Sequence, residues 1–138
     1  MENNQGKRSS DALENKPDLL NLANFPLLNE QAGLNTANSK SVLAEMLTIM
    51  VNDSLPNDLA RMKEAHDLND WESTQNIAHK IKGGAVYLGT VRLKMACQHL
   101  EHYWKSGHSE LLEPLYQQVI TVINDSLEAM NDWLEKHG

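Results

Sequence analysis

The sequence predicts an all-α fold, an antiparallel four-helix bundle with a short extra helix at its N-terminal end. Apolar residues recur at spacings of three and four through most of the chain, which is the period of an amphipathic helix. No segment of useful length alternates apolar and polar residues with a period of two, as a strand would. The 138 residues, 41% of them hydrophobic and 22% charged, suit one domain with a core of ordinary size.

The N-terminal region divides into a polar leader and a short helix. Residues 1–18 are rich in Asn, Ser, Lys and Glu and lack periodicity, so we expect residues 1–24 to form a flexible leader or interdomain linker. The bundle is then assigned to residues 25–138. Pro26 and Gly33 limit any helix in the next stretch to a short one within 27–34.

The first bundle helix is predicted to begin at Asn38 or Ser39, both good N-cap residues. Its apolar stripe comprises Val42, Leu43, Met46, Ile49 and Met50. A second stripe, Leu55, Leu59 and Met62, is out of phase with the first, and Pro56 lies at the change. This pattern predicts either one kinked helix or two short helices, ending near Leu68.

The second bundle helix is predicted over 71–88. Asn69 can adopt the left-handed conformation that ends a helix, and Asp70 can cap the next one. The inward stripe comprises Trp71, Thr74, Ile77, Ala78, Ile81, Ala85 and Leu88. Gly89 and Thr90 then supply a stop and a new N-cap.

The last two helices are predicted over 91–105 and 110–136. The stripe of the third comprises Leu93, Ala96, Cys97, Leu100 and Trp104, and Gly107 with Ser109 repeats the stop and cap. The stripe of the fourth comprises Leu112, Leu115, Val119, Val122, Ile123, Met130 and Trp133. Four amphipathic helices with short connections imply the antiparallel bundle. The single cysteine, Cys97, lies on a stripe and is expected in the core.

Composition excludes several classes of function. No apolar run approaches the roughly 20 residues that cross a bilayer, and the N-terminus has no signal-peptide pattern, so we expect a cytoplasmic protein without direct membrane contact. The net charge of −7 argues against a nucleic-acid partner. The segment from His79 to Lys105, here called the basic segment, nevertheless carries a net +4. Its partner should be acidic or phosphorylated.

The other histidines give little support for a metal or cofactor site. Metal-binding bundles use Glu-x-x-His pairs, and no Glu in this chain has a His three residues later. His99 and His102, close to Glu101, could form at most a partial, exposed site. His66, His108 and His137 fall at predicted helix ends and are expected on the surface. We therefore expect no metal and no cofactor of its own.

His79 differs because it lies about 200° round the helix from Ile81, the centre of the inward stripe, and so points at solvent. The same side of the helix also carries Glu72, Gln75, Asn76, Lys82, Gly83 and Val86. Lys82 is three residues after the histidine. Gly83, four residues after it, removes the side chain that would shield the ring. Gly84 is expected to point toward the core and to permit close helix packing.

These residues resemble a known family. The stretch "AHKIKGGAVYLG", with Asp70 and Trp71 upstream and "RLKMACQHLE" downstream, is similar to the histidine-containing phosphotransfer (HPt) domains of bacterial multistep phosphorelays. The family pattern is His-x-x-Lys-Gly and Leu-Gly, followed by a helix with Leu, a small residue or Cys, and Leu-Glu or Leu-Gln. The matching residues are His79, Lys82, Gly83, Leu88, Gly89, Leu93, Cys97, Leu100 and Glu101. The resemblance covers about residues 27–136.

The resemblance implies that His79 carries a phosphoryl group, that Lys82 interacts with this group and that Gly83 clears its approach. The phosphoryl group would come from a receiver-domain aspartate and pass to the receiver of a response regulator, with Mg²⁺ supplied by the receiver. Residues expected to contact the receiver are Gln75, Lys80, Val86, Arg92, Lys94, Glu101 and Lys105. The chain departs from the family pattern at Glu101, where Gln is common, and at Gly84, where Ser or Ala is common.

A monomer is expected, and the polar leader favours the C-terminal module of a hybrid sensor kinase over a free-standing protein. That module would be the cytoplasmic end of a membrane-bound kinase. Three other classes remain open: a dimerising kinase bundle, which needs an ATP-binding domain, a metal-binding bundle, and a helical adaptor without chemistry. The sequence contains no Gly-rich phosphate loop of its own.

Overall fold

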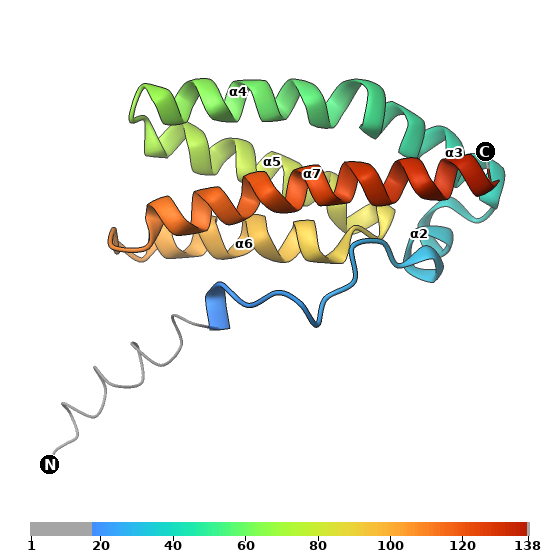
Figure 1. Cartoon of the computed structure of the whole chain (residues 1–138), viewed down its shortest axis with the longest axis horizontal. Helices are drawn as coiled ribbons and strands as arrows, with labels where there is room; N and C mark the ends of the chain where they lie inside the picture. The colour runs from blue at the N-terminus through green and yellow to red at the C-terminus, as the bar shows by residue number, and fades with distance from the viewer. Residues whose placement is uncertain (1–17, 138) are drawn as a thin grey trace, which may run out of the picture.

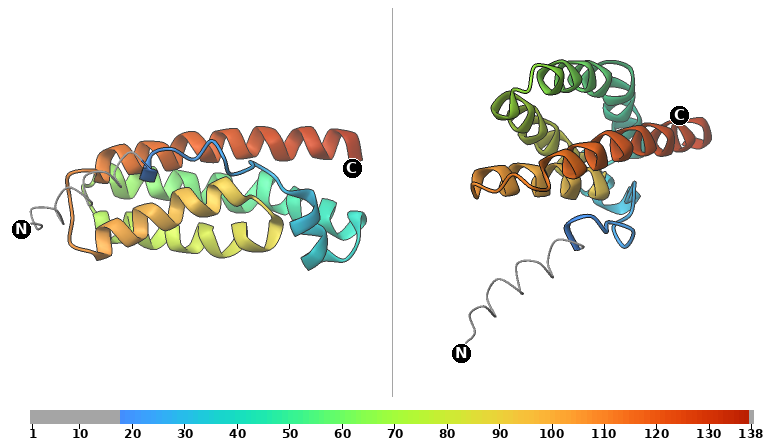
Figure 2. Two further views of the ribbon diagram at one scale, coloured as in Figure 1. Left: turned by 90° about the horizontal axis from the view of Figure 1, so that it is seen from below. Right: turned by 60° about the vertical axis from the view of Figure 1, so that its left-hand side comes forward.

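The computed structural model describes residues 18–137. Four helices form the bundle: α4 (Leu55–Asp67), α5 (Trp71–Leu88), α6 (Val91–Lys105) and α7 (Leu112–His137). They run alternately in opposite directions along one axis, as Figures 1 and 2 show. The part of the chain that the structure describes has no strand. The predicted all-α bundle is confirmed, and α2 (Glu30–Ala37) is its extra N-terminal helix.

The first arm of the bundle is one continuous helical segment with a wide turn in it. The helix α3 (Lys40–Ile49) runs through a π-helical turn, η1 (Met50–Ser54), directly into α4. The Leu55 N–H donates to the Met50 carbonyl, five residues earlier. Such a turn adds a residue and rotates the side chains that follow, which explains why the two apolar stripes are out of phase.

The predicted stripe of α3 is partly wrong. Leu43, Leu47 and Met50 face the core, whereas Val42 and Ile49 are exposed. The buried side chains of α3 are spaced four and three residues apart, as in one helical stripe, but this stripe runs through Leu47 and leaves Ile49 outside it.

Most helix boundaries follow the predicted caps. The Ser39 hydroxyl accepts from the Val42 N–H, and the Asp70 carboxylate accepts from the Ser73 N–H. Asn69 has a positive φ of 58° and separates α4 from α5. The bounds of α5 and α6 are those predicted, while α7 begins at Leu112 rather than near residue 110.

The short helix α2 is also displaced from the predicted 27–34. Asn29 serves as its N-cap, its side chain accepting from the Ala32 N–H. The Asn29 N–H donates to the Gly89 carbonyl at 2.8 Å, so α2 begins against the turn between α5 and α6. This contact fixes the N-terminal segment to the end of the hairpin that carries His79.

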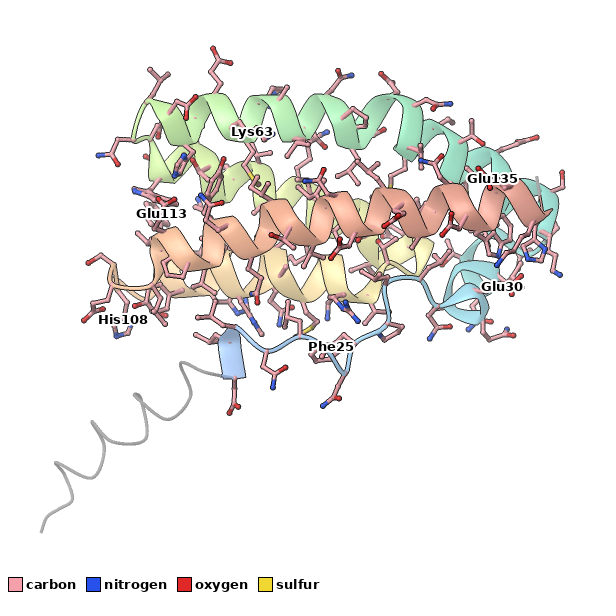
Figure 3. All side chains as sticks on the ribbon, in the orientation of Figure 1. Phe25, Glu30, Lys63, His108, Glu113 and Glu135 are labelled. Atoms are coloured by element: carbon pink, nitrogen blue, oxygen red, sulfur yellow. The ribbon has the colours of Figure 1, made fainter. Side chains whose placement is uncertain are left out.

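The described part of the predicted leader packs on the bundle. Leu22 is buried. The Leu19 carbonyl lies 3.1 Å from His99 Nδ1 and accepts from Gln118 Nε2 at 2.9 Å, which ties the segment to α6 and α7. Residues 1–17 lie outside the described residues, so the predicted domain boundary at residue 24 stays a prediction. From residue 18 onward the chain follows the bundle surface, as the ribbon near the labelled Phe25 shows (Figure 3).

The core holds apolar side chains from every bundle helix. Cys97 is buried as predicted, and burial raises the pKa of its thiol. His66 was expected on the surface but is half-buried, because its ring stacks on Tyr116 with centroids 3.8 Å apart. Its Nε2 also lies 2.7 Å from Glu113 Oε1 at the end of the bundle where α4 stops (Figure 3).

Among the described helices, none is both long enough and apolar enough to cross a membrane.

Candidate functional site

The predicted orientation of His79 is confirmed. The side chain projects from the middle of α5 and is 62% exposed. The exposed residues of this part of α5 form a strip, here called the outer face: His79, Lys80, Gly83, Gly84, Val86 and Tyr87. The side chains of α5 on either side of this strip meet α6 and α4. His79 therefore presents an accessible imidazole on a rigid helix.

A buried carboxylate on α6 holds the ring. His79 Nδ1 lies 2.7 Å from Glu101 Oε2, and the Glu101 side chain is only 3% exposed. The same carboxylate accepts from Lys82 Nζ at 2.8 Å and from Lys105 Nζ at 2.7 Å. Glu101 is thus the centre of a cluster of four ionisable side chains, here called the Glu101 cluster.

The charge state of Glu101 fixes the tautomer of the histidine. Burial acts to raise the pKa of the Glu101 carboxyl. Hydrogen bonds from Lys105, Lys82 and His79 outweigh burial and lower that pKa to about 2. An ionised carboxylate can only accept hydrogen bonds, so Nδ1 of His79 must carry the proton that it donates. The lone pair of the neutral ring is then on Nε2.

Gly83 leaves the approach to the ring open. An added Cβ at Gly83 would meet no atom within 4 Å, so its absence is not needed for packing within the chain. The same is true of Gly84, which is exposed. The prediction that Gly84 points toward the core is therefore wrong. Gly84 lies instead beside a groove along α5, which it helps to line.

Gln75 is also misplaced by the helical wheel. It was expected beside His79 on the exposed side, but it is 2% exposed and its Nε2 donates to the Glu72 carbonyl at 3.1 Å and to Asn76 Oδ1 at 2.8 Å. Packing of both α4 and α6 against α5 buries a wider arc than one stripe. Val86 does lie on the outer face, as predicted.

The basic segment does not form one cationic patch around His79. Lys80 turns to the other flank of α5, where its Nζ donates to both oxygens of Asp58 on α4 at 2.8 and 2.9 Å. Arg92 donates to the backbone carbonyls of Phe25 and Ala23, and Lys94 contacts Met95 Sδ at 3.8 Å. Two lysines of the segment, Lys82 and Lys105, belong to the Glu101 cluster.

Lys82 is not the solvated cation that its position on the helix suggested. Its side chain is 19% exposed and is paired with Glu101. The sequence contained both residues of this pair, but their separation of 19 positions hides the contact until the α5–α6 hairpin is built. Asp58, the partner of Lys80, was missed for the same reason.

An apolar groove runs beside the outer face, between α5 and the α3–η1–α4 arm. It has a volume of about 410 Å³. Its lining includes Met46, Ile49, Leu55, Gly84 and Tyr87. Ile49 and Tyr87 are the large apolar side chains of this lining that are more than half exposed. Met50 and Ser54 of η1 also line it, so the groove requires the assembled arm and is not predicted by any pattern in the sequence.

Within residues 18–137, no group of three or more His, Cys, Asp or Glu side chains is placed to hold a metal ion. His99 faces the backbone of the N-terminal segment, and His102 is exposed. The two histidines of the "HLEH" stretch therefore do not converge.

Comparisons with known proteins agree with this geometry. The family model described as the Hpt domain matches residues 45–133, which contain most of the arm, both helices of the His79 hairpin and most of α7. A solved structure, the HPT domain of a sensor hybrid histidine kinase from Shewanella, superposes with a TM-score of 0.69 at 29% identity. The match covers 80% of this chain and 95% of that one. A comparison with curated proteins finds no match.

The family match extends over more than half of the chain and includes the hairpin on which the site is built. The superposed structure, which comes from the same family, is matched over nearly its whole length. The chain belongs to the Hpt domain family and is a histidine phosphotransfer carrier of a phosphorelay.

Proposed function

We propose that this carrier accepts a phosphoryl group on Nε2 of His79 from a receiver-domain aspartate and passes it to the aspartate of a second receiver. The observation that carries the proposal is the His79 ring itself. It is exposed on a rigid helix, its Nδ1 is held by the buried Glu101 carboxylate, and Gly83 leaves its approach open. A neutral imidazole with a free Nε2 is a good nucleophile near neutral pH.

Transfer requires positioning and charge more than covalent machinery in the carrier. The phosphorus must lie in line between His79 Nε2 and the aspartate oxygen, with cations on its non-bridging oxygens. We expect the receiver to bring Mg²⁺ in its own acidic pocket. Lys82, one turn along α5, supplies a cation next to the ring while it is paired with Glu101. On this proposal the chain is a carrier and needs no ATP site.

We further propose that the receiver covers the outer face of α5 and the adjoining apolar groove. A partner centred on His79 and extending toward Gly84 meets the groove directly, since Gly84 and Tyr87 line it. The basic segment contributes less than the sequence suggested, because most of its cations have partners within the chain. Apolar contact would then supply more of the docking affinity than charge does.

Replacing Ile49 with lysine tests this docking surface. Ile49 is 58% exposed at the groove, so the variant should fold normally while the transfer rate from a subsaturating receiver falls about tenfold, the effect of a charge in a docking site. The matched control is Leu68→Lys. Leu68 is 72% exposed and lies at the far end of the same arm, and its replacement should leave transfer unchanged. Equal effects of the two variants would show that the receiver does not use the groove.

Replacing Lys82 with alanine separates its two roles. The variant should lose about 1–2 kcal/mol of unfolding free energy, because a buried carboxylate loses a charged hydrogen-bond donor. It should also slow transfer, because a cation beside the ring is gone. Lys63→Ala is the control, since Lys63 is an exposed lysine of α4 outside the basic segment. Denaturant melts and single-turnover transfer rates measure both effects. If Lys82→Ala behaves like Lys63→Ala, the ion pair carries neither role.

The function itself is tested by incubating the protein with a panel of phosphorylated receiver domains and measuring its intact mass. A cognate receiver should add one phosphoryl group that acid removes and base does not. Addition of an unphosphorylated second receiver should then discharge it. A protein that binds receivers but never gains phosphate would instead be a helical adaptor.

The setting of the carrier is proposed from its relative. Since the Shewanella domain belongs to a sensor hybrid histidine kinase, we propose that this chain serves a kinase of the same kind, as a monomeric module in the cytoplasm.

A further inference from the structure

The Glu101 carboxylate can accept a hydrogen bond from a protonated Nδ1 of His79, but it cannot donate one to an unprotonated Nδ1. Glu101 is ionised and buried, and its Oε2 lies 2.7 Å from His79 Nδ1. A glutamine at the same place could turn either its oxygen or its amide toward the ring and so tolerate both states of Nδ1. An ionised carboxylate can only accept hydrogen bonds. It favours the ring that carries a proton on Nδ1.

This asymmetry matters most after phosphorylation. A ring phosphorylated on Nε2 can exist with Nδ1 bare, in which case the ring is neutral, or with Nδ1 protonated, in which case the ring is cationic. The cationic form is the better phosphoryl donor, because the N–P bonding pair returns to a positive ring and leaves a neutral imidazole. A carboxylate that accepts from the Nδ1–H stabilises this reactive form.

We infer that Glu101 is a positioning residue that keeps the phosphorylated ring of His79 protonated on Nδ1 at neutral pH, and so keeps it ready for transfer. This inference rests on the proposed role of His79. It concerns a charge that the chain places beside the ring, not the identity of the acceptor.

Transfer in either direction then needs no proton movement. When phosphate arrives, the Nε2 lone pair forms the N–P bond, the P–O bond of the aspartyl phosphate breaks, and its electron pair stays on the aspartate. The Nδ1 proton remains in place, and the ring gains a positive charge opposite the Glu101 carboxylate. When phosphate leaves, the receiver carboxylate attacks phosphorus and the N–P pair returns to Nε2. The ring is again neutral with its proton on Nδ1.

The charged groups around the ring are suited to this role. Glu101 and Lys105 come from α6, and Lys82 comes from α5, the helix that carries His79; both lysines donate to the Glu101 carboxylate beside the ring. The acid that α4 contributes, Asp58, is bonded to Lys80 and Arg61 on the other flank of α5. The two lysines of the Glu101 cluster keep the carboxylate ionised, so the shared proton stays on nitrogen instead of moving to oxygen.

Nitrogen NMR of the phosphorylated protein tests the inference directly. The protein is labelled with ¹⁵N-histidine, phosphorylated with phosphoramidate, and compared with a His79→Gln sample to assign the ring signals. At pH 7.5 we expect a phosphorylated His79 ring with a proton bonded to Nδ1. A phosphorylated ring whose Nδ1 is bare at this pH overturns the inference and leaves the proposed function standing. Absence of phosphate on His79 overturns both.

Two variants separate charge from structural support. Glu101→Gln keeps the size and hydrogen bonding of the side chain but removes its charge. The pH at which the phosphorylated ring loses its Nδ1 proton should fall by about one to two units. Lys105→Gln keeps the carboxylate and removes a neighbouring cation, so the same midpoint should rise. A general loosening of the site would move both midpoints in the same direction, which would contradict the role given to Glu101. An unchanged midpoint in Glu101→Gln would contradict it as well.

Discussion

Replacing Gly83 with glutamine is expected to stabilise the protein and to slow phosphoryl transfer about a hundredfold, the loss that a small displacement of reacting groups can cause. The fold should tolerate the change, because a Cβ at Gly83 meets nothing within 4 Å and an interior helical glycine costs up to about 1 kcal/mol. Side chains on a helix lean toward its N-terminus, so a glutamine at this position lies over the turn that carries His79.

A graded pair of variants distinguishes access from helix stability. Gly83→Ala gains the same helix propensity with a single methyl group and should slow transfer only moderately. Gly84→Ala gains it on the groove side of α5, where the added Cβ also has free space. Melting temperatures and single-turnover rates are measured for all three. Transfer at the parent rate in a well-folded Gly83→Gln protein would show that the receiver does not reach His79 across Gly83.

Replacing Gly89 with alanine is expected to destabilise the fold by about 3 kcal/mol, of which left-handed strain and the loss of one hydrogen bond are the main parts. Gly89 has a φ of 79°. An added Cβ would lie 2.3 Å from the Asn29 carbonyl oxygen, which is backbone and cannot turn aside. The N-terminal segment would have to leave the α5–α6 turn, and the hydrogen bond from the Asn29 N–H to the Gly89 carbonyl would break.

Gly107→Ala is the matched control for this effect. Gly107 has a similar φ of 84°, but a Cβ there would meet nothing within 4 Å. The control should therefore show the backbone strain alone, about 1 kcal/mol, in denaturant melts. Equal losses in the two variants would mean that the close approach at Asn29 adds nothing to the stability of the domain.

The parts of the fold that were predicted correctly depend on local chemistry. Asp70 caps α5 and Asn69 ends the helix before it because of side-chain and backbone preferences that a few neighbouring residues determine. The exposure of His79 also follows from helical geometry alone, since one buried stripe fixes the opposite side of the helix.

The parts that were missed depend on which helices meet. The π-helical turn at Met50–Ser54 changes the register of the arm without any cap signal in the sequence, and two of its residues, Met50 and Ser54, line the groove. Gln75 and Lys82 are covered because a second helix flanks α5, which a wheel drawn for one helix cannot represent. The family resemblance pointed to Glu101 as a contact residue, but its burial and its two lysine partners required the assembled hairpin.

The central claim is that His79 is the phosphoacceptor, and locating the phosphate tests it most directly. The parent protein and a His79→Gln variant are incubated with the same phosphorylated receiver, digested at alkaline pH and mapped by mass spectrometry. We expect a single phosphoryl group on His79 in the parent, stable to base and lost in acid, and none in the variant. Phosphate that persists in the His79→Gln protein, or that maps to another histidine of the parent, would contradict the claim.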